Sequence, residues 1–73
     1  MKTEYSFDEV QSRLEILLRD AEVKSGTKKG LLLERVYVMG MLGTGVKINP
    51  AVEMMLLCGR SVAGYVRPQE AKV

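Results

Sequence analysis

The 73-residue chain contains no histidine, no tryptophan and one cysteine, Cys58. One cysteine cannot form an intrachain disulfide, and without histidine it cannot complete a zinc site of Cys and His ligands. The lack of histidine also removes the commonest general base of enzymes. We therefore expect a protein that is not an enzyme and has no catalytic residues, no metal and no cofactor.

Long apolar runs are also missing. The longest uncharged stretches, 36–46 and 54–59, are shorter than the roughly 18 apolar residues that a transmembrane helix needs. The N-terminal residues lead into a charged segment instead of the apolar centre of a signal peptide. An unpaired cysteine without a signal peptide suits a reducing compartment. We expect a cytoplasmic protein that does not contact a membrane.

Charge is scarce in the middle of the chain, where only five residues between Leu31 and Val66 are charged. A chain of this length buries only about 60% of the surface that its unfolded form exposes. Some of the apolar surface is therefore expected to remain exposed on a monomer. Because disulfides and zinc are excluded, tight helix packing or self-association must supply the missing stability, and we expect self-association.

The net charge of +2 is unevenly distributed. Residues 1–26 carry four basic and six acidic side chains, whereas residues 27–73 carry seven basic and three acidic ones. The two halves could attract each other, within or between subunits, or the basic half could contact nucleic acid. We favour the first interpretation, because DNA-binding domains normally have a denser basic patch.

The first predicted element is a helix over about 7–24, after which Gly26 offers a left-handed stop. Ser6 followed by Glu9 is a capping-box pattern, and Tyr5 and Val10 occupy the positions of a hydrophobic staple. Apolar side chains then recur at steps of three and four residues and form one stripe: Phe7, Val10, Leu14, Leu17, Leu18 and Ala21.

The second predicted element, a helix over about 30–43 with Thr27 before it as a candidate N-cap, is apolar almost all round. Such a helix belongs in a core or an interface. A β-hairpin over about 33–48, turned by Gly43-Thr44-Gly45, is the alternative and would make the fold α+β. We favour the helix because the run 31–34 consists of strong helix formers.

The third predicted element is a helix over about 50–66. Asn49 is a suitable cap, and Pro50 fits the first helical position because its missing N–H costs nothing there. Gly59 and Gly64 each weaken this helix by about 1 kcal/mol relative to alanine, so a break near Cys58-Gly59 is the alternative. Pro68 prevents continuation, and 69–73 are expected to form a disordered tail. Apolar residues fall at helical spacing between these limits: Val52, Met55, Leu56, Gly59, Val62, Ala63 and Val66.

These elements predict an all-α fold in which 1–73 form one domain. The first helix packs over an apolar hairpin made by the second and third helices. We expect two copies to associate through surfaces of the hairpin and to form a symmetric dimer.

Two glycine-rich stretches and the cysteine are weak candidates for chemistry. Residues 26–30 lack the residue order of a phosphate-binding loop, and 43–45 lack the third glycine of a dinucleotide site. Both are interpreted as turns. Cys58 lies among leucines and is interpreted as a small buried hydrophobic residue.

Two helices joined by a glycine-containing turn also suggest a helix-turn-helix DNA-binding regulator. Its second helix would need polar side chains that read base edges. The helix from Pro50 carries only Glu53 before Arg60. We keep this function as the alternative, with contacts mostly to phosphate through Lys28, Lys29, Lys47, Arg60 and Arg67.

The favoured function is a non-enzymatic protein–protein interaction module, namely a small regulator, inhibitor or chaperone-like adaptor that acts as an oligomer. Its expected partners are a second copy and another protein. Methionine adapts to irregular surfaces, and tyrosine is enriched at binding faces, although the methionines could equally fill a core. A subunit that completes an active site on a larger partner is a third possibility. The candidate partner-binding residues are Tyr37, Met39, Met41, Met54, Met55 and Tyr65, with Arg35, Lys47 and Arg60 as a polar rim.

Overall fold

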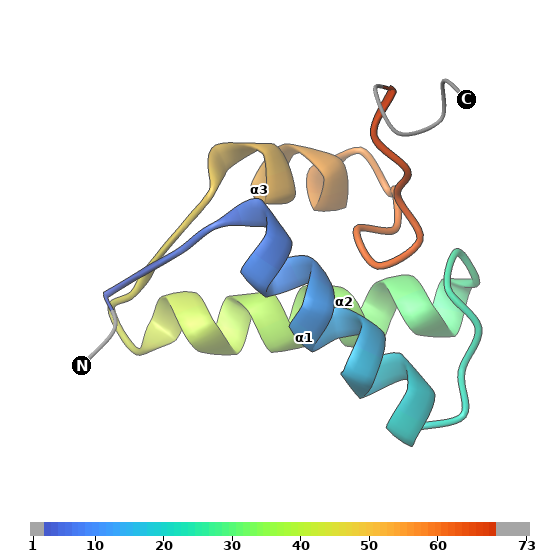
Figure 1. The fold of residues 1–73 in the computed structure, drawn as a ribbon. Helices are drawn as coiled ribbons and strands as arrows, with labels where there is room; N and C mark the ends of the chain where they lie inside the picture. Colours follow the sequence, from blue (N-terminus) through green and yellow to red (C-terminus); the bar gives the residue numbers. More distant parts are fainter. Residues whose placement is uncertain (1–2, 69–73) are drawn as a thin grey trace.

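The computed structural model describes residues 3–68, so the predicted tail at 69–73 lies outside the described part (Figure 1). The prediction of a small, mainly helical domain with three helices is confirmed. The alternative hairpin at 33–48 is wrong, because most of that range is helical. In chain order the elements are β1 (Glu4–Tyr5), α1 (Phe7–Asp20), α2 (Lys28–Gly43), β2 (Lys47–Ile48) and α3 (Pro50–Leu57).

Each helix begins at the cap that the sequence predicts. The Ser6 side chain accepts the Glu9 N–H at 3.2 Å, and the Glu9 carboxylate accepts the Ser6 N–H at 3.0 Å. Thr27 accepts the N–H three residues later at 3.1 Å, and Asn49 accepts the N–H two residues later at 2.8 Å. These caps satisfy N–H groups that have no partner inside the helix.

The helix α1 ends at Asp20, four residues before the predicted end. Glu22 adopts a positive φ of 56°, and the Val23 N–H donates to the Leu18 carbonyl at 3.0 Å. This hydrogen bond across five residues is the Schellman motif that closes a helix. The chain therefore leaves the helix before it reaches Gly26, where we expected the stop.

The helix α3 is only half as long as predicted, because it ends at Leu57 and not near 66. Gly59 has a φ of 73°, and the Arg60 N–H donates to the Met55 carbonyl at 2.8 Å. Glycine adopts this left-handed conformation at little cost, so a second Schellman motif forms here. The following residues form an irregular segment that turns back over the other helices (Figure 1).

This irregular segment is held by side chains from both other helices. The buried Glu34 on α2 accepts the Val62 N–H at 2.8 Å and the Ser61 hydroxyl at 2.7 Å. From α1, the Gln11 amide donates to the carbonyls of Val62 and Tyr65 at 3.0 and 2.8 Å. The N–H and the carbonyl of Val62 are therefore both hydrogen-bonded, and its side chain is fully buried in the core.

The two short strands are parallel and join the start of the chain to the link between α2 and α3. Glu4 lies opposite Lys47, and Tyr5 lies opposite Ile48. The Lys47 N–H donates to the Thr3 carbonyl at 2.8 Å. The pairing places the Ile48 side chain in the core.

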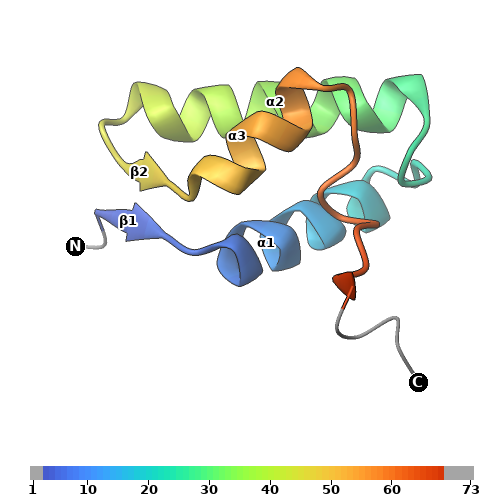
Figure 2. The same cartoon turned by 90° about the horizontal axis from the view of Figure 1, so that it is seen from above.

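The helices α1 and α3 lie on the same side of α2 (Figure 2). No helix within residues 3–68 is long and apolar enough to cross a membrane. The predicted stripe of α1 supplies four core residues, whereas α2 supplies one apolar core residue, Val38, because its apolar residues are spread around the helix. The buried apolar residues are Phe7, Val10, Leu14, Leu18, Val38, Ile48, Val52, Leu56 and Val62.

Candidate functional site

An apolar groove lies between α2 and α3. Its floor is formed by the buried side chains of Val38 and Leu56, and its hollow has a volume of about 180 Å³. Ligand sites for small molecules are usually larger, about 300–1,000 Å³. The groove is therefore better suited to individual side chains of another protein than to a cofactor.

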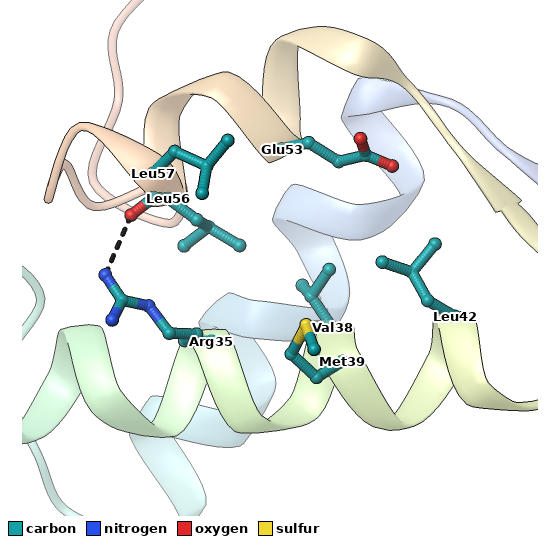
Figure 3. Close-up of a pocket in the computed structure, with 7 residues that line it drawn as sticks. All are labelled: Arg35, Val38, Met39, Leu42, Glu53, Leu56 and Leu57. Atoms are coloured by element: carbon teal, nitrogen blue, oxygen red, sulfur yellow. Dashed lines mark hydrogen bonds between the residues drawn. The ribbon is translucent and has the colours of Figure 1, made fainter.

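The walls of the groove are apolar and open to solvent. Met39 on α2 is 63% exposed, and Leu57 on α3 is 79% exposed. Leu42 continues the α2 wall (Figure 3). Large apolar side chains that surround a hollow in this way are more unusual than isolated exposed ones, and they mark candidate interaction sites.

The two charged residues of the groove lie at opposite ends (Figure 3). At one end, the Arg35 guanidinium donates at 3.0 Å to the Leu56 carbonyl, which also accepts the Gly59 N–H at 3.1 Å. At the other end, Glu53 is exposed. The groove therefore offers an apolar centre with a positive group at one end and a negative group at the other.

A second hollow lies on the opposite flank of α2, toward α1, and contains Tyr37 and Met41. The Arg13 guanidinium lies there, 4.8 Å from the centre of the Tyr5 ring. A side-chain hydrogen bond with Tyr37 is the main cause that raises the pKa of Arg13 above its usual value. Tyr37 therefore interacts with α1 and lies away from the groove.

The structure does not bring the nine predicted partner-binding residues to one face. Arg35 and Met39 line the groove, whereas Tyr37 and Met41 line the other flank of α2. The remaining five lie elsewhere: Met54 is exposed on α3, Met55 and Tyr65 pack against the core, Lys47 lies in β2, and Arg60 follows α3. The rings of Tyr65 and Phe7 pack in an edge-to-face arrangement, with ring centres 5.7 Å apart.

Five of the seven residues that line the groove were not among the predicted site residues: Val38, Leu42, Glu53, Leu56 and Leu57. Glu53 and Leu57 are four residues apart, so they share a side of α3 next to its buried face. This spacing is the signal that could have identified them. The interpretation of Cys58 as buried is wrong, because α3 ends just before it and leaves it exposed at the helix end.

Comparison with known proteins gives no match to a protein-family model, a curated protein or a solved structure. Among residues 3–68, no cluster of three or more His, Cys, Asp or Glu side chains is arranged to hold a metal ion. The groove is the feature whose geometry supports a function most directly, through apolar contacts with charged groups at its ends.

Proposed function

We propose that the chain is a non-enzymatic protein–protein interaction module that takes an apolar helix of a partner protein into the groove between α2 and α3. The observation that carries this proposal is the exposure of Met39 and Leu57 on the two walls above a buried apolar floor. Leaving both side chains in water is unfavourable, and a partner that covers them recovers this free energy. A small regulator, inhibitor or adaptor would act in this way.

The groove also limits the chemistry of the partner. A helix that lies in a groove presents apolar residues at steps of three and four positions. Arg35 at one end favours an acidic side chain of the partner, and Glu53 at the other end favours a basic one. The partner expected here is an amphipathic helix whose apolar stripe has an acid near one end and a base near the other.

Self-association is part of the proposal. Leu32 and Val36 are each 60% exposed and lie on α2 outside the groove. A groove that binds a partner does not cover them. A second copy of the chain would cover this surface and would present two grooves on one assembly.

The proposal is tested in two steps. First, a photo-crosslinking amino acid in place of Leu57, in the cells that make the protein, attaches the partner covalently so that it can be identified. Second, calorimetry measures how tightly the purified partner binds to the chain. A charge in the groove, Leu57→Glu, is expected to weaken binding about tenfold or more, as at other central interface positions. The matched control is Ile16→Glu, an exposed apolar position on α1, and binding to this variant should equal that of the wild type. Equal binding by wild type and Leu57→Glu would contradict the proposal.

DNA binding remains the alternative, and the described residues support it less. Of the five candidate phosphate contacts, Lys47 lies opposite the acidic Glu4 in the strand pair, and Arg67 forms an ion pair with Asp8. A salt titration with duplex DNA separates the two functions. A complex dominated by phosphate contacts weakens steeply as salt rises, whereas binding in an apolar groove changes little.

A further inference from the structure

The helix α2 has two faces, and the rest of the chain packs against only one of them, although the other face also carries large apolar side chains. The covered face contains Glu34 and Val38. On the other side, Leu32, Val36 and Met39 are 60%, 60% and 63% exposed. Steps of four and three residues keep these three side chains in one stripe along the helix, which is the spacing of a helix–helix seam.

The residues of this stripe have a large side chain at one end of the helix and no side chain at the other. Four residues after Met39 the same stripe reaches Gly43, where an added Cβ would meet no atom within 4 Å. Gly40, on the flank of the stripe, is equally open. The backbone of another helix can therefore approach this end closely, while Leu32 projects from the other end.

We propose that the stripe of Leu32, Val36, Met39 and Gly43 binds the same stripe of a second copy, with the two α2 helices antiparallel. In this pairing Leu32 of each copy lies against Gly43 of the other, and Val36 lies against Met39. The large end meets the small end twice, as the two-fold symmetry of a homodimer requires. The two ends of one helix are complementary to each other, and for this reason the occupant is a second copy.

The charges of α2 favour the same orientation. Lys28 and Lys29 lie in its first turn, and its last turn contains no basic residue. Lysines next to the positive end of a helix dipole are unfavourable, whereas lysines next to the negative end are favourable. An antiparallel pair places each lysine pair beside the last-turn carbonyls of the other copy. A parallel pair would bring four lysines together.

This dimer rests on the self-association included in the proposed function and assigns it a surface. It does not use the groove residues Glu53 and Leu57, and Met39 is the only residue that belongs to both surfaces. Loss of the dimer by a change at Val36 and loss of partner binding by a change at Leu57 are therefore separate outcomes.

Sedimentation of the full chain over a range of concentrations tests the dimer. The wild type is expected to be dimeric, and Val36→Lys is expected to raise the dissociation constant about 100-fold or more, because two charges would be buried at the seam. Ile16→Lys, on the exposed side of α1, is the matched control and should remain dimeric. A monomeric wild type, a dimeric Val36→Lys variant or a monomeric control would overturn the proposal.

A second variant separates the interface from the fold. Gly43→Leu should keep the helical fold of the monomer, because the position is helical and open. In the dimer the new side chain would collide with Leu32 of the other copy, so this variant should be monomeric. Retention of the dimer in Gly43→Leu would overturn the pairing.

Disulfide cross-linking tests the orientation. Leu32→Cys and Gly43→Cys are each made in a Cys58→Ser background, so that each protein has one cysteine. Oxidation of a mixture of the two variants should give a cross-linked dimer that contains one of each. Oxidation of either variant alone should give little. Efficient cross-linking of Leu32→Cys to itself would indicate parallel helices and would overturn the proposal.

Discussion

The buried carboxylate of Glu34 accepts the backbone N–H of Val62 at 2.8 Å, although the two residues are 28 positions apart. The Ser61 hydroxyl donates to the same carboxylate at 2.7 Å. Ser61 has only one hydroxyl proton, so in its 2.7 Å contact with Ser25 the Ser25 hydroxyl is the donor. The carboxyl oxygens of Glu34 therefore hold the segment that follows α3 against α2.

Removal of the Glu34 carboxylate should destabilise the fold. In Glu34→Ala the buried Val62 N–H loses its acceptor, and the expected cost is about 2–4 kcal/mol in the free energy of unfolding. Glu34→Gln keeps one acceptor oxygen and should cost about 1 kcal/mol. Urea unfolding followed by circular dichroism measures both. The control Glu53→Ala, at an exposed position, should change little, and equal stability of Glu34→Ala and wild type would contradict this role of Glu34.

Truncation to alanine should lower the free energy of unfolding much more at Val62 than at Val66. Both occur at helical spacing in the sequence, but Val62 is fully buried and Val66 is 60% exposed. Val62→Ala is expected to lower the free energy of unfolding by about 2 kcal/mol through the cavity that it leaves. Val66→Ala should leave it almost unchanged. Similar losses for both variants in urea unfolding would argue that the two valines lie on one helix face, as in the longer α3.

Two glycines of α2 should respond to alanine with opposite signs. Helix propensity alone predicts that alanine stabilises both positions by about 1 kcal/mol. At Gly30, however, an added Cβ would lie 2.6 Å from the Lys24 carbonyl oxygen, whereas at Gly40 it would meet nothing within 4 Å. Gly40→Ala should therefore raise the thermal midpoint and Gly30→Ala should lower it. If both variants raise it, the turn before α2 does not pack as described.

Cys58 should react with a thiol reagent in the folded protein. Its side chain is exposed at the end of α3, so the reagent can reach it without unfolding. We expect about one equivalent of Ellman's reagent to react in buffer as completely as in denaturant. A thiol that reacts only in denaturant would instead support the buried position that the neighbouring leucines suggested.

The candidate site was predictable only in part. Met39 and Arg35 were identified because methionines on an apolar helix and nearby cations are typical of interfaces. Leu57 was missed, since its role depends on which side of α3 faces α2. That side is set by the burial of Val52 and Leu56, and burial is a property of the packed chain.

The sequence by itself determined where the helices begin and which stripe of α1 is buried. The caps at Ser6, Thr27 and Asn49 act over two or three residues, and the apolar stripe repeats within one helix, so both signals are local. Tertiary structure decided how the segment after α3 packs and that a groove forms. Gly59 ends α3 through a local Schellman motif. The carboxylate from α2 and the amide from α1 that bind the Val62 backbone come from residues far away in the sequence, so they leave no local pattern.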